Sequence, residues 1–238
     1  MTFSPKSFQT LALVSTTAAA TLFAGIGGAA ADSSVKLLTA HFDTRNVVQI
    51  EAGEFHFEPG QVAPIHTHSA PAVGYVAKGS IIYQVEGEAP QVLHEGAAFY
   101  EPVDQRILRF DNLSATEEAI FIDFNLEQEG EPFIVFEEQP TEAIDRRALP
   151  TIDIADQSVS RVEISNHSLE PNGSFDLVNE DSSLFYVAEG IVELKGTETQ
   201  TVRLIAGQTF AGSPDTREVS VSNASSDVPA ELVIFRLN

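Results

Sequence analysis

Short apolar runs separated by turn-forming residues cover most of this chain. In the first half, segments rich in Val, Ile and Phe lie at 47–57, 72–77, 80–85, 91–93, 107–110 and 119–126. In the second half, comparable segments lie at 159–164, 184–188, 191–194, 201–205, 218–221 and 231–237. Short runs of this kind, bounded by Gly, Pro, Asp and Asn, predict β-strands, and their close spacing favours a sandwich or small barrel. Nothing in the pattern supports a long helix, so we predict an all-β protein.

The second half of the chain repeats the first. Displaced by 111 residues, positions 60–126 align with positions 171–237 without a gap and share 14 identities in 67 positions. Unrelated sequences of ordinary composition share only about one position in fifteen. Many identities fall on turn and core residue types, including Tyr75 and Tyr186, Gly79 and Gly190, Gly96 and Gly207, Asn112 and Asn223, and Phe124 and Phe235. Two copies of this length predict two domains rather than a long solenoid.

The repeat sets the expected domain limits at 32–126 and 158–238, joined by a linker at 127–157. The linker is rich in Glu and Pro, and we expect an edge strand at 133–136 and one helical turn near 141–147. Residues 1–31 are predicted to be a secretory signal. Lys6 provides a short positive start, an Ala-rich apolar run follows, and Ala29–Ala31 fits a cleavage site.

The formal net charge of −22 restricts the partners of the mature chain. A strongly acidic surface repels nucleic acid and anionic membranes, so we expect neither as a partner once the signal is removed. The chain has no Cys, so its stability must come from packed cores and not from disulfides. Together with the predicted signal, the acidity indicates a secreted or periplasmic protein.

Two histidines give the sequence its clearest chemical feature. His66 and His68 lie two residues apart on an extended segment, so their side chains point to the same side. Two imidazoles on one face are a plausible beginning of a metal site.

The glycines and prolines around this pair resemble the two signature motifs of the cupin family. Gly60 is followed after five residues by His66 and His68, and Gly79 lies eleven residues beyond His68. Gly96, five residues and then Pro102 resemble the start of the second motif. Two such modules in one chain resemble a bicupin, and the resemblance implies two tandem jelly-roll barrels of the double-stranded β-helix, RmlC-like type.

The chain departs from this resemblance at positions that would bind metal. The family usually carries a Glu at the position of Ala72 and a His at the position of Ile107. In the ungapped alignment, the corresponding positions of the second copy are Leu177, Asn179, Ser183 and Glu218. The second barrel is therefore expected to be degenerate and unable to bind metal in the manner of the family.

Glu101 is the candidate for a third ligand in the first copy, because the resemblance implies that its segment approaches the pocket. His66, His68 and Glu101 would form a two-His, one-carboxylate set for a divalent metal such as Fe, Mn, Zn or Ni. Alternation along a strand is a counter-argument, because Glu101 faces outward if Tyr100 faces inward. The alternative is that the His pair is a relic whose imidazoles only form hydrogen bonds at the pocket mouth.

Further polar residues are candidates for the substrate pocket. Tyr83, Gln84 and Tyr100 occur only in the first copy, so they could distinguish its pocket. Arg106 could clamp a substrate, but Asp104 and Arg106 recur in the second copy, which favours a role in a turn. His56 and His167 occupy matching positions in the repeat, which suggests a structural role for both.

Two functions follow from these patterns. The first is a secreted bicupin that binds a divalent metal in its N-terminal barrel and acts on a small oxygen-rich or aromatic substrate, as a dioxygenase, isomerase or lyase. The second is a non-catalytic cupin that binds a small molecule or has a structural role, and it could pair as a homodimer. A third and weaker hypothesis is a metal-independent isomerase with a His as base.

Overall fold

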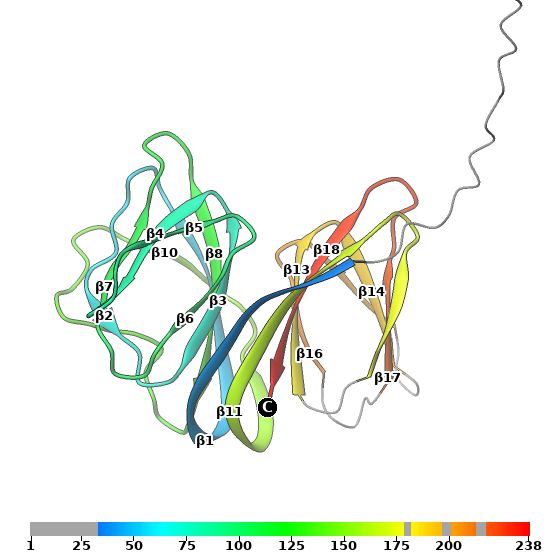
Figure 1. The fold of residues 1–238 in the computed structure, drawn as a ribbon, viewed down its shortest axis with the longest axis horizontal. Helices are drawn as coiled ribbons and strands as arrows, with labels where there is room; N and C mark the ends of the chain where they lie inside the picture. The colour runs from blue at the N-terminus through cyan, green and yellow to red at the C-terminus, as the bar shows by residue number, and fades with distance from the viewer. Residues whose placement is uncertain (1–32, 179–181, 197–200, 213–217) are drawn as a thin grey trace, which may run out of the picture.

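The computed structural model describes residues 33–178, 182–196, 201–212 and 218–238, and these form an all-β protein of two modules side by side (Figure 1). The predicted signal at 1–31 lies outside the described residues. Within the described residues, no helix is long and apolar enough to span a membrane. The all-β prediction is confirmed, and the predicted limits of the domains stay predictions.

The N-terminal module packs one end of a nine-stranded sheet against a five-stranded sheet of order β5-β4-β7-β2-β9. Its strands are β1 (Ser33–Phe57), β2 (His66–Thr67), β3 (Ala72–Lys78), β4 (Ser80–Val85), β5 (Gln91–His94), β6 (Ala98–Glu101), β7 (Ile107–Asn112), β8 (Ala119–Glu127), β9 (Val135–Phe136) and β10 (Asp145–Ala148). Between the sheets lies a core of mostly aromatic residues: Phe55, Phe57, Tyr83, Phe99, Phe110, Phe121 and Phe133.

The C-terminal module packs the other end of the long sheet against a four-stranded sheet of order β12-β17-β14-β15. Its strands are β11 (Ile152–Leu169), β12 (Ser174–Val178), β13 (Ser182–Glu189), β14 (Ile191–Gly196), β15 (Val202–Ile205), β16 (Thr209–Gly212), β17 (Glu218–Asn223) and β18 (Ala230–Leu237). Its core is aliphatic rather than aromatic, with Leu177, Val192, Leu194, Leu204, Leu232 and Ile234 among its members.

A single sheet runs through both modules in the order β16-β13-β18-β11-β1-β8-β3-β6. The long strands β1 and β11 pair at its centre and cross between the modules (Figure 1). A third core lies between the modules, where repeat-equivalent aromatic rings meet: Tyr75 with Tyr186 and Phe124 with Phe235. These repeated aromatic residues are therefore identical because they form the contact between the two copies.

The strand β8 shows how one element serves two cores. Ile122, Phe124 and Leu126 point into the core between the modules, and Phe121 points into the N-terminal core. Both faces are therefore buried along most of β8. The face that carries Phe121 continues with three buried polar residues, Asp123, Asn125 and Glu127.

Two repeat-equivalent asparagines stabilise matching turns. The side-chain amide of Asn112 donates to the carbonyl oxygens of Phe57, Glu58 and Glu117. The amide of Asn223 makes the equivalent three bonds, to Leu169, Glu170 and Val228. Buried amides need hydrogen-bond partners, and each of these side chains satisfies its own while it fixes a turn. The identity of Asn112 and Asn223 in the repeat therefore has a structural reason.

The hydrogen-bonded register corrects the ungapped alignment near the predicted site. His66 pairs with Ile107, whereas Val178 pairs with Glu218, so the counterpart of His66 is Val178 and not Leu177. Around this position the two copies are therefore displaced by one residue more than the 111 residues of the ungapped alignment. Asn179 lies outside the described residues. The same shift applies to His56. His56 pairs with Ile120, and Ser168 pairs with Glu231, which is the counterpart of Ile120. The counterpart of His56 is therefore Ser168, so His56 and His167 are not equivalent.

The expected helical turn near 141–147 is wrong. Residues 145–148 form the strand β10 instead, which pairs with β1 from Gly53 to His56. Arg146 explains the preference for a strand, because its guanidinium lies over the Phe133 ring at 3.9 Å and its side chain pairs with Glu51. The expected edge strand in this segment is present as β9, which pairs with β2.

Candidate metal centre

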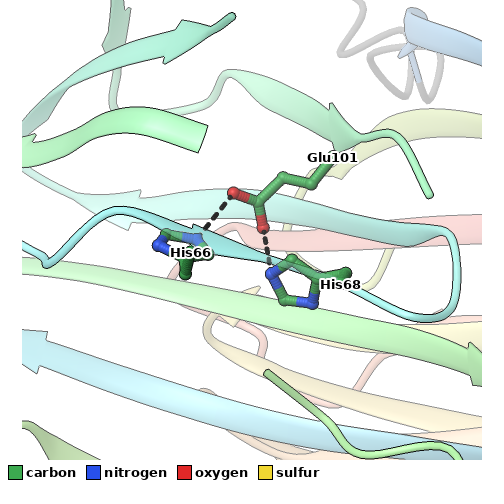
Figure 2. A group of neighbouring side chains, drawn as sticks. All are labelled: His66, His68 and Glu101. Carbon is green, nitrogen blue, oxygen red and sulfur yellow. Dashed lines mark ion pairs between the residues drawn. The ribbon is translucent and has the colours of Figure 1, made fainter. Parts of the chain in front are cut away.

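Three side chains from two neighbouring segments meet inside the N-terminal module (Figure 2). His66 lies on β2, His68 follows it and bridges to Val103, and Glu101 is the last residue of β6. All three are buried, with 4%, 1% and 2% of their surfaces exposed. Glu101 points inward because β6 buries Phe99 and Glu101 on one face and turns Tyr100 away.

The distances between these groups suit a shared ion. Glu101 Oε2 lies 3.1 Å from His68 Nε2, and Glu101 Oε1 lies 3.5 Å from His66 Nε2. The three potential ligand atoms all lie within 4.8 Å of one another. Ligand atoms that share one ion at about 2.0–2.2 Å lie roughly 3–3.5 Å apart, so the spacing fits.

Oxygen acceptors fix both imidazoles in the orientation that a metal needs. His66 Nδ1 lies 2.8 Å from the Pro64 carbonyl oxygen, and His68 Nδ1 lies 3.1 Å from Asn125 Oδ1. These oxygens can only accept, so each Nδ1 carries the proton, and both Nε2 atoms face Glu101. Asn125 is oriented in turn, because its NH₂ group donates to the Phe133 carbonyl oxygen.

This arrangement calls for a positive charge between the three groups. His68 Nε2 and Glu101 Oε1 are buried and form no hydrogen bond within the described part of the chain. Burial lowers the pKa of His68, but Glu101 together with Asp123 and Asn125 outweighs burial, and the net pKa is raised. Burial raises the pKa of Glu101, but His68 and His66 together outweigh it, and the net pKa is lowered. Either a proton on His68 or a metal cation satisfies this demand.

A small cavity adjoins the three groups. Its volume is about 30 Å³, enough for about one or two water-sized species. The walls are largely aromatic, with Phe55, Phe57, Phe110, Phe121 and Phe136 among the lining residues. A fourth polar residue, Asp123, also lines the cavity, and its Oδ1 is buried without a hydrogen-bond partner in the described structure. Burial and the nearby charge of Glu101 raise the pKa of Asp123.

The four residues predicted for the substrate pocket lie elsewhere, and none lines this cavity. Tyr83 is buried in the aromatic core and donates to the Tyr100 carbonyl oxygen. Tyr100 faces the core between the modules, near Phe42. Gln84 donates to the Glu88 carbonyl oxygen, and Arg106 lies at the surface between Glu86 and Glu137. Packing and surface pairing therefore account for these four residues in the structure.

Asp123 and Asn125 were missed, although the sequence carries a signal for them. They interrupt the apolar run Ala119–Leu126 at alternate positions, where a strand buried on both faces should be apolar. Polar side chains at every second residue of such a strand indicate a polar lining on one face.

The register also explains the missing motif residue at Ala72. Ala72 lies directly opposite Glu101 on the paired strands β3 and β6. A carboxylate on Glu101 can therefore reach the region that the Glu of the family motif would occupy from position 72. In the second module the equivalent pair is Ser183 opposite Gly212, so position 212 offers no carboxylate there.

Comparison with known proteins agrees with the fold. A family model described as "Cupin domain" matches residues 53–124, which include His66, His68 and Glu101. A search among curated proteins finds no match.

Several solved structures are similar to the chain at low sequence identity. Salicylate 1,2-dioxygenase from Pseudaminobacter salicylatoxidans is 14% identical, with a TM-score of 0.54 over 80% of this chain and 71% of that chain. AerE from Microcystis aeruginosa is 14% identical, with a TM-score of 0.56 over 85% and 98%. Vicilin from Capsicum annuum is 14% identical, with a TM-score of 0.56 over 81% and 76%. At this identity the likeness concerns the fold.

Residues 53–124 therefore form a cupin domain, and the fold of the chain is similar to that of solved cupin structures. The buried group of His66, His68 and Glu101 lies inside that domain as a candidate metal site.

Proposed function

We propose that the N-terminal cupin domain binds one divalent ion, such as Fe, Mn, Zn or Ni, through His66, His68 and Glu101. The observation that carries the proposal is the buried two-His, one-carboxylate set, in which the Nε2 atoms of His66 and His68 both face the Glu101 carboxylate, at 3.5 and 3.1 Å. Two neutral imidazoles and one carboxylate are a donor set typical of non-haem iron and related sites with open positions. When bound, such an ion polarises a ligand oxygen as a Lewis acid.

The residues around the set define what the protein itself would contribute to a reaction. Pro64 and Asn125 hold the imidazoles in the ligand tautomer. The aromatic walls make the lining largely apolar, and Asp123 Oδ1 can hold or accept a proton at the cavity wall. These features support an enzyme that acts on a small oxygen-rich or aromatic molecule, and a dioxygenase among the structural neighbours agrees with this class.

Metal binding by the purified full chain tests the proposal. We expect one ion per chain by elemental analysis after loading with Mn²⁺, Zn²⁺ or Fe²⁺, and a loss of affinity of about 100-fold or more in His66→Ala and in Glu101→Gln. His94→Ala is the matched control, because His94 is exposed on β5 and bonds only to Ser80 in the described structure. If His66→Ala and His94→Ala bind metal equally well, the proposal is wrong.

A second function, a non-catalytic small-molecule-binding or structural cupin, is favoured by the cavity volume of about 30 Å³, which is below the size of ordinary organic ligands. Detection of a product whose formation stops on chelation and resumes with metal would exclude this alternative.

We also propose that the protein is a bicupin exported to the periplasm or the exterior. The internal repeat and the two packed modules support the first part, and the character of residues 1–31 supports the second. N-terminal sequencing of the protein from its host would show a start near residue 32 if the signal is removed.

A further inference from the structure

A path of polar side chains leads away from the candidate metal centre along β8. Asn125 Oδ1 lies 3.1 Å from His68 Nδ1, and the amide nitrogen of Asn125 lies 3.5 Å from Glu127 Oε1. Glu127 Oε2 accepts a hydrogen bond of 2.8 Å from Gln49 Nε2. Glu127 does not line the cavity, so it can act on the centre only through Asn125.

Glu127 is a costly group to bury at this position. Asn125 and Glu127 are both 0% exposed, and no Lys or Arg of the described structure pairs with this carboxylate. Its partners are instead the NH₂ groups of Gln49 and Asn125, which only donate. Both carboxylate oxygens therefore serve as acceptors, and one of them is used on Asn125.

The orientation of Asn125 decides which nitrogen of His68 carries the proton. With Oδ1 towards the ring, as in the structure, Nδ1 holds the proton and Nε2 can bind a metal. With the NH₂ group towards the ring, Nδ1 would have to accept, and the proton of a neutral ring would lie on Nε2. Two acceptors hold the NH₂ group on the far side, the Phe133 carbonyl oxygen and Glu127 Oε1.

We propose that Glu127 is a positioning residue for metal binding, which holds the NH₂ group of Asn125 and thereby the metal-binding tautomer of His68. A carboxylate often orients a metal-bound imidazole directly. Here an amide stands between the carboxylate and the ring. The inference rests on the proposed function for the presence of the ion.

The second module supports this assignment. Strand pairing places Arg236 and Asn238 at the positions of Asn125 and Glu127. The same module has Gly212 where the first module has its candidate carboxylate ligand. The copy without the metal-binding set therefore also lacks the amide and the carboxylate that orient it.

The isosteric variant Glu127→Gln tests the role of the second carboxylate oxygen. A Gln side chain has one oxygen, and while that oxygen accepts from Gln49, its NH₂ group faces the NH₂ group of Asn125. We expect the Zn²⁺ affinity of the purified full chain to fall about tenfold, measured by competition with a chromophoric chelator. Burial raises the pKa of Glu127, so the measurements are made at pH 8.

A second substitution should repair the first. In the double variant Gln49→Ala/Glu127→Gln, the amide oxygen at position 127 is free to turn towards Asn125, and affinity should return to within about threefold of the unmodified chain. A lost charge or poorer packing would not be repaired by a further truncation. Unchanged affinity in Glu127→Gln, or no recovery in the double variant, would overturn the inference.

Asp111→Asn is the matched control for the lost charge. Asp111 is a buried carboxylate on β7 that pairs with Arg109 and does not line the cavity. Its variant should keep Zn²⁺ affinity within about threefold. A tenfold loss in this variant as well would mean that overall charge, and not the orientation of Asn125, sets the affinity. Thermal unfolding shows that each variant is folded.

A measurement on metal-free protein separates this inference from the proposed function. The Nδ1 proton of His68 donates to Asn125, so its ¹H–¹⁵N signal in histidine-labelled protein should exchange slowly with water. Exchange should be about tenfold faster in Glu127→Gln and slow again in the double variant. If no sample binds metal, the proposed function fails, and equal exchange in all three samples would show that Glu127 does not position His68.

Discussion

At the residue scale, the centre combines three groups that would each be costly to bury alone. The Nδ1 atoms of His66 and His68 are occupied by oxygen acceptors, which leaves both Nε2 atoms directed at one carboxylate. The Glu101 carboxylate lies 3.5 and 3.1 Å from these two nitrogens, so either a proton on the His pair or a metal cation neutralises its buried charge.

This arrangement predicts that metal affinity rises with pH. The raised pKa of His68 means that a proton must leave before an ion binds, so affinity for Mn²⁺ should rise up to about tenfold per pH unit between pH 6 and pH 8. In metal-free protein the sign is opposite, since the His68–Glu101 pair stabilises the fold below the ordinary pKa of His68 and this contribution is lost as pH rises through the raised value. Calorimetry in two buffers of different protonation enthalpy should count nearly one proton released per ion.

The control for this experiment is His94→Ala, which should retain the same pH dependence. Affinity that does not change between pH 6 and pH 8, or no proton release, would show that His68 is not a ligand.

At the element scale, the neighbouring strands β3, β6 and β8 form the sheet that carries Glu101 and Asp123 beside the His pair. Gly74 on β3 lies opposite Phe99 on β6 and opposite Asp123 on β8. A Cβ atom at Gly74 would overlap the Phe99 ring and the Ile122 carbonyl oxygen. The absence of a side chain here lets Phe99 pack across β3, next to the wall that carries Asp123.

We therefore expect Gly74→Ala to lower the free energy of unfolding by about 1–3 kcal/mol through overpacking. Urea unfolding followed by fluorescence or circular dichroism measures this change. In a double-mutant cycle, Phe99→Leu should relieve part of the penalty, because the ring is one of the two groups that the new methyl meets. Unchanged stability in Gly74→Ala would show that β3 and β6 are not packed as described.

Most of the strands and the orientation of the His pair could be predicted from the sequence, and the exceptions have identifiable causes. The apolar runs and turn residues predicted the strands, and the His66 and His68 spacing placed both imidazoles on one face. Glu101 was predicted only as a candidate, because alternation alone does not say whether the even or the odd residues of β6 face inward. Asp123 lies beside the site through pairing between strands, and Tyr83, expected near the pocket, packs its ring into the aromatic core.

At the scale of the whole molecule, the repeat produces a shared interior. Equivalent residues of the two copies, Phe124 and Phe235, meet with ring centroids 4.8 Å apart, and both are fully buried. The central strands β1 and β11 continue the same sheet through both modules. At the described positions equivalent to His66 and Glu101 the second module has Val178 and Gly212, but its contact face is retained. The second module covers part of the sheet that continues into the first module.

This view predicts energetic coupling across the contact between the modules. Phe124→Ala and Phe235→Ala should each lower the free energy of unfolding by about 3–5 kcal/mol, and the double variant should lose about 0.5–1.5 kcal/mol less than the sum. Phe185→Ala is the control for Phe235, because Phe185 is equally buried but lies in the core of the second module alone. Its effect should add to that of Phe124→Ala within about 0.5 kcal/mol. Denaturant unfolding measures these free energies, and additivity of Phe124 with Phe235 would mean that the two modules do not stabilise each other through these rings.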